Sequence, residues 1–225
     1  MGLYVETRVR AGLDTLWERT QDPAQHERWD LRFTEITYLP GEPGAEAEGE
    51  PRRFRYAVRV LPFLVVAGTG VSAGERHRAG GDRVSSLRFA SPDPLSLLAE
   101  GSGYWRYVPQ PDRADGIRFL TGYDYRPRWG RFGRLADRLV FRPLMGWATA
   151  WSFDRLRLWC EHGITPERAR THWQLELAAR ALLTALGAAV HPAALALACA
   201  AALLVPPSPR TPAARRCLRT PPEKS

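Results

Sequence analysis

The hydrophobic period changes once along this chain, and that change constrains the fold more than any other feature. From about residue 52 to residue 125, apolar and polar residues alternate in short runs separated by Pro, Gly and Asp clusters, as in antiparallel strands. From Gly130 to about His162 the bulky residues recur at three- and four-residue spacings, the period of a helix. A sheet followed by a long helix is therefore expected.

The strand runs each have one apolar face. Phe54, Tyr56 and Val58 alternate with polar or small residues, mostly arginine, so one face of this strand is expected to be buried and the other to meet water. A strand near the N-terminus repeats the pattern. The seven expected strands lie at about 3–9, 33–39, 52–60, 65–75, 83–90, 103–108 and 117–125.

Two short helices are expected between the first two strands, at about 13–20 and 23–28. The second follows Asp22-Pro23, an N-cap acid with a proline in the first turn. The helical run that closes the domain is interrupted at Arg142-Pro143, where proline is expected to end one helix and open the next. The expected order of elements is thus β-α-α-β6-α.

This order is the helix-grip topology, and two stretches resemble the START/Bet v 1-like superfamily, the SRPBCC or polyketide cyclase group. They are Leu16-Trp17 through Asp22-Pro23 and His26 to Arg28-Trp29-Asp30, and Gly133-Arg134-Leu135-Ala136-Asp137 through Trp147 to Trp159. The resemblance covers about residues 3–162 and implies an α+β fold, in which a curved seven-stranded antiparallel sheet wraps a long C-terminal helix. It also implies an internal cavity for lipids, sterols, polyketides or plant-type hormones, with aromatisation or cyclisation in some members. Fold alone does not choose among these.

Aromatic residues dominate the positions that would line such a cavity. Buried aromatic residues more often simply fill a core, but interior Tyr and Trp need hydrogen-bond partners that a ligand or water can supply. The predicted ligand-binding residues are Phe54, Tyr56, Val58, Trp105, Tyr107, Phe119, Thr121, Tyr123 and Tyr125 on the strands and Trp147 and Trp151 on the long helix.

The phase of the strand at 103–108 stays open at the level of sequence. With Trp105 and Tyr107 pointing inward, the cavity wall is aromatic. A shift by one residue would turn Tyr104 and Arg106 inward instead, and a buried arginine would suit a carboxylate, enolate or phosphate.

Motifs that carry catalysis or bind metal are absent from the sequence. There is no G-x-S-x-G, no H-E-x-x-H, no Gly-rich phosphate loop before a helix, and no cluster of acids or histidines at metal-ligand spacing. No metal and no cofactor are therefore expected, and His26 and His77 are expected at the surface.

Binding of a hydrophobic small molecule such as a lipid or polyketide, for carriage or sensing, is the favoured function. One alternative is a cyclase, aromatase or dehydratase in which Tyr123 and Arg106 orient an enolisable substrate. The other is a non-catalytic interaction partner.

The chain is basic, with 32 Lys and Arg residues against 24 acids and a net charge of +8. Its arginine- and alanine-rich composition is typical of a GC-rich bacterial genome, although a basic surface also attracts anionic lipid. Arg131, Arg134 and Arg138 recur at helical spacing and are the predicted membrane-surface residues, with a solvated helix face as the alternative. No nucleic-acid-binding module accompanies them, so nucleic acid is not an expected partner.

Three segments are expected: a ligand-binding domain at 1–163, a helical appendage at 164–205 and a disordered basic tail at 206–225. The appendage opens at Thr165-Pro166-Glu167, a helix start. From Ala181 to Val205 it has no charged residue, and His191-Pro192 interrupts it.

Those uncharged residues would be long enough to cross a bilayer. A single span, however, would separate the basic tail from a folded domain with no export signal. The preferred interpretation is a helical hairpin turning near His191-Pro192, which dips into the cytoplasmic leaflet or packs on the core.

A cytoplasmic location fits the cysteines and the N-terminus. Cys160, Cys199 and Cys217 are far apart and have no C-x-x-C spacing, as expected in a reducing compartment. The first ten residues contain no continuous apolar run, so no secretory signal is expected. Attachment to the inner face of the cell membrane is a further option.

Overall fold

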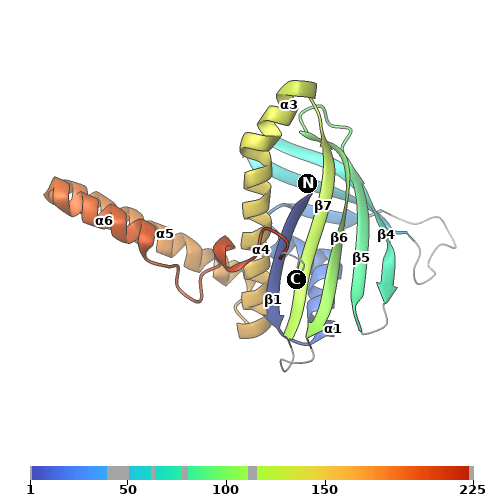
Figure 1. Ribbon diagram of the computed structural model, residues 1–225, viewed down its shortest axis with the longest axis horizontal. Coiled ribbons are helices and arrows are strands. Elements are labelled where there is room, and N and C mark those ends of the chain that lie inside the picture. Colours follow the sequence, from blue (N-terminus) through green and yellow to red (C-terminus); the bar gives the residue numbers. More distant parts are fainter. Residues whose placement is uncertain (1, 40–50, 62–63, 78–80, 111–115, 223–225) are drawn as a thin grey trace.

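The computed structural model describes residues 2–39, 51–61, 64–77, 81–110 and 116–222. The largest elements of this part of the chain are a single antiparallel sheet, a long helix against its inner face and a projecting pair of helices (Figure 1). The parts of the expected segments that fall at 40–50, 62–63, 78–80, 111–115 and 223–225 lie outside the described residues.

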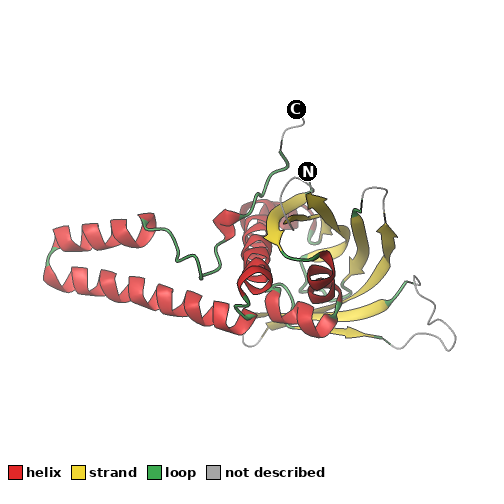
Figure 2. Ribbon diagram, turned by 90° about the horizontal axis from the view of Figure 1, so that it is seen from below, coloured by secondary structure: helices red, strands yellow, loops and turns green. Residues whose placement is uncertain are grey.

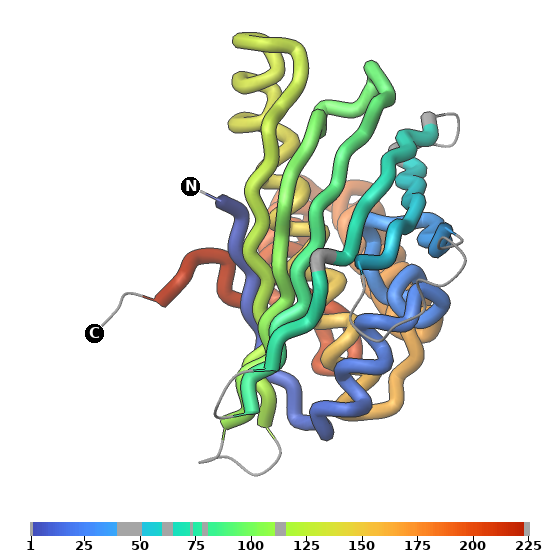
Figure 3. The backbone as a smooth tube through the Cα atoms, turned by 90° about the vertical axis from the view of Figure 1, so that its right-hand side faces the viewer, coloured from blue at the N-terminus to red at the C-terminus, as the bar shows by residue number. Residues whose placement is uncertain are grey.

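The sheet contains seven strands in the order β1-β7-β6-β5-β4-β3-β2. They are β1 (Leu3–Arg10), β2 (Glu35–Tyr38), β3 (Arg53–Leu61), β4 (Leu64–His77), β5 (Arg83–Ala90), β6 (Leu98–Gln110) and β7 (Gly116–Pro127). All neighbouring pairs are antiparallel. Figure 3 shows these strands side by side, with the long helix behind them. The seven expected strands are confirmed, β2 being shorter and β6 and β7 longer than expected.

Irregular places in the strands allow the sheet to curve. The register shifts between Arg59 and Leu61 and between Ser72 and Glu75. Rings from β3 also rest directly on glycines of β4, because a Cβ at Gly70 would lie 2.2 Å from the Phe54 ring. The same holds at Gly68, where a Cβ would lie 2.3 Å from the Tyr56 hydroxyl oxygen. These glycines let the two aromatic side chains approach the neighbouring strand closely.

The helices that cover the inner face are α1 (Leu13–Gln21), α2 (Pro23–Trp29) and α4 (Arg142–His162). The Asp22 carboxylate caps α2 by accepting a hydrogen bond from the Ala24 N–H at 3.0 Å. Gly163 ends α4 in the left-handed conformation, with φ of 62°. The α+β helix-grip fold, which is the SRPBCC-like architecture that the resemblance implied, is therefore confirmed.

The expected helix break at Arg142-Pro143 takes a different form. Helix α3 (Gly130–Ala136) continues through a π-helical turn, Asp137–Phe141, directly into α4. Pro143 lacks an N–H and would crowd the carbonyl one turn earlier in a regular helix. The wider π turn just before it allows the helical path to continue.

The core lies where α2 and α4 meet the sheet. Trp29, Phe119, Phe153 and Leu156 are fully buried there. The rings of Phe119 on β7 and Phe153 on α4 stack with centroids 4.5 Å apart. This contact holds the long helix against the last strand.

The appendage is an antiparallel helical hairpin. Helices α5 (Pro166–Val190) and α6 (Pro192–Leu204) lie against each other and turn at His191, whose Nδ1 accepts a hydrogen bond from the Ala193 N–H at 3.1 Å. A Cβ at Gly187 would lie 2.9 Å from the Ala194 carbonyl oxygen, so glycine permits the close helix contact. The expected hairpin is confirmed, but it projects away from the sheet and does not pack along the core (Figure 2).

No helix among the described residues has the length and apolar character needed to cross a membrane.

The expectation of a disordered tail is wrong for residues 206–222. This segment returns along α4, where Thr211, Ala213 and Cys217 are buried. The physical reason is Asp154 of α4, which is fully buried and binds the tail. Its Oδ2 accepts hydrogen bonds from the Ala213 N–H at 2.8 Å and from Arg216 Nη1 at 2.9 Å. Buried carboxylates need such donors.

The end of the tail is also tied to the sheet. Leu218 and Glu6 exchange two backbone hydrogen bonds of 2.9 Å. The Cys217 thiol lies against the Ala150 carbonyl oxygen at 3.2 Å, and burial raises its pKa to about 12. Cys217, which an unstructured tail would expose, is therefore protected from solvent.

Candidate functional site

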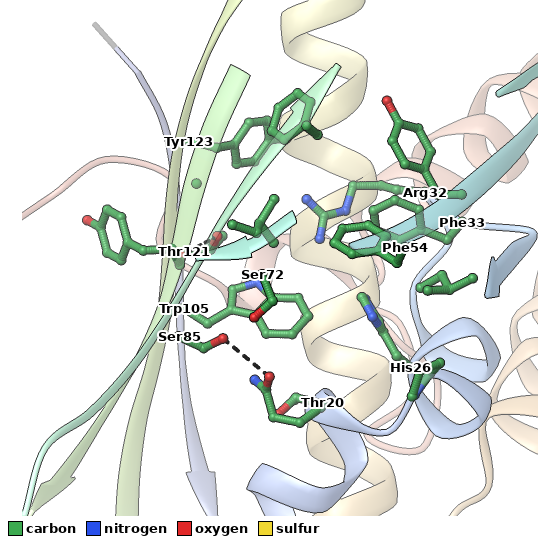
Figure 4. A pocket seen from close by; sticks show the side chains of 18 of the residues that line it. Thr20, His26, Arg32, Phe33, Phe54, Ser72, Ser85, Trp105, Thr121 and Tyr123 are labelled. Carbon is green, nitrogen blue, oxygen red and sulfur yellow. Dashed lines mark hydrogen bonds between the residues drawn. The ribbon is translucent and has the colours of Figure 1, made fainter. Parts of the chain in front are cut away.

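A cavity of about 140 Å³ lies between the inner face of the sheet and helices α1, α2 and α4 (Figure 4). An apolar cavity of about 150 Å³ is large enough to hold benzene. The apolar part of the wall is formed by Pro23, Phe33, Ile36, Tyr38, Phe54, Tyr56, Val58, Leu87, Phe89, Leu98, Trp105, Tyr123 and Met145. The space accommodates a ring-sized apolar group.

Part of the predicted ligand-binding set lies together on this wall. The residues concerned are Phe54, Tyr56 and Val58 of β3, Trp105 of β6, and Thr121 and Tyr123 of β7. Trp105 and Tyr107 are 6% and 0% exposed, so the strand phase that turns them inward is confirmed.

Three other predicted residues lie on the same sheet face but do not line the cavity. The Tyr107 hydroxyl is 2.6 Å from Thr20 Oγ1 and accepts a hydrogen bond from Gln21 Nε2, so it is part of the core beside α1. Phe119 is covered by Phe153. Tyr125, near the end of β7, donates a hydrogen bond to Asp137. The inner face of the long strands extends beyond the cavity at both ends.

The prediction for Trp147 and Trp151 is wrong in its choice of face. Trp151 packs edge-on against Trp173 of α5 with ring centroids 5.9 Å apart, and Trp147 stacks on Trp151. Helix α4 is buried on two sides, so its tryptophan stripe meets the appendage and the tail. Met145 is the residue of α4 that lines the cavity.

Arg106 lies outside the cavity. Its Nη2 forms an ion pair with Asp82 at 2.6 Å. The alternative strand phase that would have turned it inward is therefore wrong, and so is its place beside Tyr123 in a catalytic pair. An arginine does line the cavity, but it is Arg32, from the connection between α2 and β2.

A buried polar cluster of His26, Asp30 and Arg32 forms one part of the wall. Asp30 Oδ1 accepts hydrogen bonds from the Arg32 backbone N–H at 3.0 Å and from its Nε at 2.9 Å. Asp30 Oδ2 accepts from Arg32 Nη2 at 2.6 Å and pairs with His26 Nε2 at 3.0 Å. Each oxygen therefore has two partners, which saturates the carboxylate.

This cluster shifts the pKa values of Asp30 and Arg32. Burial alone would raise the pKa of Asp30, but the Arg32 charge and the hydrogen bonds from His26 and Arg32 outweigh it and hold that pKa well below its usual range. Burial likewise opposes the charge on Arg32, yet Asp30 raises the Arg32 pKa above its usual value. Asp30 is thus an ionised acceptor, and His26 Nε2 carries a proton.

His26 is not at the surface, contrary to expectation. It is 9% exposed, stacks on Trp29 with centroids 5.0 Å apart and meets the edge of Trp105 at 4.8 Å. The stretch from Asp22 to Asp30, which carried the family resemblance, therefore supplies a polar wall of the cavity as well as packing. The four-residue spacing of His26 and Asp30 was the sequence signal that could have identified the pair.

Arg32 lies between aromatic rings inside the cavity. Figure 4 shows its guanidinium between Tyr123 on one side and Phe33 and Phe54 on the other. The Cζ atom is 5.5 Å from the Phe33 ring centre and 5.6 Å from that of Tyr123. The charge is therefore held at the wall rather than in solvent.

Two of the buried residues on the wall have a polar side-chain group with no protein partner within the described part of the chain. These are the Tyr56 hydroxyl and the Trp105 indole N–H, in residues that are 7% and 6% exposed. Burial raises the pKa of Tyr56 to about 12. Both groups are hydrogen-bond donors that a ligand in the cavity could use.

The described ranges contain no group of three His, Cys, Asp or Glu residues that could hold a metal ion.

The predicted membrane-surface residues lie away from the cavity. Arg131, Arg134 and Arg138 are exposed on α3 and the π turn, at one end of the molecule in Figure 1. Phe132 and Leu139 beside them are 70% and 64% exposed. The structure thus places basic and apolar side chains together there, and their contact with a membrane stays a prediction.

No family model matches the chain. It is 50% identical over 167 residues to the uncharacterized membrane protein YndG of Bacillus subtilis (strain 168), a match that covers 74% of this chain and 59% of that protein. The chain therefore spans less than two thirds of the length of this relative.

Solved structures similar to the chain include the Zhui aromatase/cyclase from Streptomyces, at 15% identity and a TM-score of 0.44 over 69% of this chain and 95% of that one. They also include a START superfamily protein from Mycobacterium smegmatis, at 11% identity and a TM-score of 0.39 over 65% and 94%. Similarity of this size supports no conclusion on ligand or reaction. The helix-grip assignment rests on this chain's own strand order and helix placement.

Proposed function

We propose that the chain binds a hydrophobic small molecule in the cavity between sheet and helices. The observation that carries this proposal is a space with aromatic walls that contains a buried arginine and two unpaired donors, Tyr56 and Trp105. Ligand sites commonly combine an apolar wall with a few convergent polar groups. Carriage or sensing needs no further chemistry.

Catalysis by a cyclase or dehydratase has weaker support than binding. Arg106 lies outside the cavity, and the Nε2 proton of His26 is held by Asp30. The Tyr123 hydroxyl lies 3.2 Å from Thr149 Oγ1. Because the Thr149 hydroxyl donates its own proton to the Met145 carbonyl, Tyr123 must be the donor to Thr149. The described wall therefore offers hydrogen-bond donors rather than a free base beside a free acid.

Filling the cavity tests the binding proposal. Val58 lines the cavity, so Val58→Phe is expected to reduce the amount of co-purifying hydrophobic compound, measured by native mass spectrometry, by at least about tenfold. Val65→Phe is the matched control, because Val65 is 44% exposed and points to the outer face of the adjacent strand. Equal ligand content in both variants and the original chain would contradict the proposal.

We also propose that the α5–α6 hairpin inserts into one leaflet of a membrane. From Ala181 to Val205 the hairpin has no charged residue, and exposed leucines and valines occur on both of its helices. Helix α6 is apolar on all sides, as expected for a helix surrounded by lipid, whereas a helix paired with a second copy of the chain would keep a polar face. The Bacillus relative is named a membrane protein.

The position of the charges fits that arrangement. Arg180 closes the uncharged part of the hairpin by donating hydrogen bonds to the carbonyls of Ala202 and Val205 near the C-terminus of α6. The exposed Arg210 follows in the tail, where it can meet anionic headgroups. Thirteen residues of α6 extend about 20 Å, roughly the depth of one leaflet and its interface.

Vesicle flotation separates this surface from that on α3. Leu186→Glu and Leu197→Glu on the hairpin are expected to lower binding to phosphatidylglycerol vesicles by about tenfold or more, because each moves a charge into apolar surroundings. Leu139→Glu on the π turn is the matched control and is expected to bind normally. Loss confined to Leu139→Glu would instead assign the contact to the surface of Arg131, Arg134 and Arg138.

A further inference from the structure

The polar cluster in the cavity is electrically balanced before any ligand enters. All four hydrogen bonds accepted by the Asp30 carboxylate come from within the cluster: two from the Arg32 guanidinium, one from the Arg32 backbone and one from His26. The side chain of Asp30 has no exposed surface and that of Arg32 is 9% exposed, so solvent does little to screen the pair. The charges of Asp30 and Arg32 therefore neutralise each other within the ion pair, without a ligand.

Arg32 nevertheless keeps hydrogen-bonding capacity. A guanidinium has five N–H groups, and the side-chain bonds to Asp30 use one at Nε and one at Nη2. Beyond the hydroxyl of Tyr123, the described residues give no further acceptor to this side chain. Arg32, Trp105 and Tyr56 therefore all present hydrogen-bond donors to the cavity. A ligand that carries a hydrogen-bond acceptor is complementary to this wall.

The sign of the ligand follows from the charges around the space. Besides tyrosines, the groups on the described cavity wall that can carry charge are Arg32 and His26, with Asp30 directly behind them. An ionised carboxylate entering here would find a cation already paired and would face the Asp30 carboxylate across it. A buried charge without a counter-charge is strongly disfavoured.

We propose that the cavity selects a neutral apolar ligand with an oxygen acceptor, such as a ketone, ester or alcohol, and rejects the ionised acid of the same skeleton. This inference rests on the proposed binding function and specifies its ligand class. The acceptor oxygen meets Arg32, and the hydrocarbon lies among Phe54, Val58 and Trp105. A free fatty acid at neutral pH is thereby excluded, while an esterified or carbonyl-bearing compound is accepted.

Three one-ring probes of similar size test the inference on the full chain. Acetophenone carries an acceptor, ethylbenzene has none, and benzoate carries a charge. By NMR titration at neutral pH, acetophenone is expected to bind about tenfold tighter than ethylbenzene, because it gains a hydrogen bond from a charged donor. Benzoate is expected to bind at least about a hundredfold more weakly than acetophenone.

Asp30→Asn should reverse the order. This variant leaves the Arg32 charge unbalanced, so benzoate is expected to become the tightest of the three probes. Asp22→Asn is the charge-matched control, since Asp22 caps α2 outside the cluster and asparagine caps equally well; it should keep the original order. Circular dichroism establishes whether Asp30→Asn folds, and if it does not, the order in the original chain decides alone.

The outcomes separate this inference from the proposal beneath it. If benzoate binds the original chain as tightly as acetophenone, selection for neutral ligands is overturned while cavity binding stands. Equal affinities for acetophenone and ethylbenzene would remove the role of Arg32 as donor. If none of the probes binds and Val58→Phe carries as much co-purified ligand as the original chain, the cavity proposal fails and the ligand class fails with it.

Discussion

Asp30→Ala is expected to lower the free energy of unfolding by about 3–5 kcal/mol, because it leaves the buried Arg32 guanidinium without its counter-charge. His26 loses its partner in the same step. Urea denaturation followed by circular dichroism measures the change. A loss below about 1 kcal/mol would contradict the description of Arg32 as a buried, balanced charge.

The double variant Asp30→Leu with Arg32→Met is the control for this prediction. Replacing both members of a buried ion pair by apolar residues is often nearly neutral, so the double variant is expected to recover most of the lost stability. It should bind acetophenone and ethylbenzene with similar affinity, since the donor is gone. Stability would then be assigned to the charge balance of the Asp30–Arg32 pair, and ligand selection to the hydrogen-bond donor of Arg32.

The pH dependence of the Asp30 contribution has a defined sign. The folded-state pKa of Asp30 is lowered, so its stabilisation is fully present above the unfolded value of about 3.9 and is lost as the pH falls through the folded value. The difference between the original chain and Asp30→Ala is therefore expected to stay constant from neutral pH to about pH 5 and to shrink below about pH 4.

Asp154→Ala is expected to destabilise the chain by about 3 kcal/mol and to release the tail. Asp154 is fully buried. It forms ion pairs with Arg157 at 2.7 Å and Arg216 at 2.9 Å and accepts a hydrogen bond from the Ala213 N–H at 2.8 Å. In the variant, Arg157 keeps its ion pair with Glu161 at 2.8 Å and Arg216 can turn into water, which limits the loss of stability. The Ala213 N–H loses its hydrogen-bond acceptor, and the tail loses its fixed attachment to α4.

Cys217 reports on the release. Its thiol is 7% exposed with a raised pKa, so iodoacetamide should label it slowly in the original chain and at least about tenfold faster in Asp154→Ala. Arg210→Ala removes an exposed arginine from the same tail and should leave the labelling rate unchanged. Slow labelling in Asp154→Ala would show that the tail stays in place without the carboxylate.

The parts of the fold predictable from sequence are those that local geometry dictates. The alternation of Phe54, Tyr56 and Val58 with polar residues fixes the inner face of β3 because successive strand residues point to opposite sides. Asp22-Pro23 fixes the start of α2 through its cap. Strand number, helix order and the hairpin turn at His191 follow from signals of this kind.

The parts that could not be predicted depend on contacts between distant segments. The tryptophan stripe of α4 was real, but only the fold shows that Trp151 meets Trp173 of the appendage. Ordering of the tail depends on Asp154, 59 residues from its partner Ala213. The polar wall of the cavity was missed because His26 and Arg32 are ordinarily surface residues, and pairing through Asp30 is what permits their burial.

The exchange of hydrogen bonds between Leu218 and Glu6 has a consequence for how copies of this chain meet. Strand β1 is the outermost strand on its side of the sheet, and an uncovered outermost strand is a template onto which another molecule can add a strand. By pairing there, Leu218 occupies the backbone N–H and C=O of Glu6, two of the groups that such an addition would use. The tail thus hinders the addition of a strand from another molecule at this edge, and its half-buried Arg216 holds the tail in place through the ion pair with Asp154.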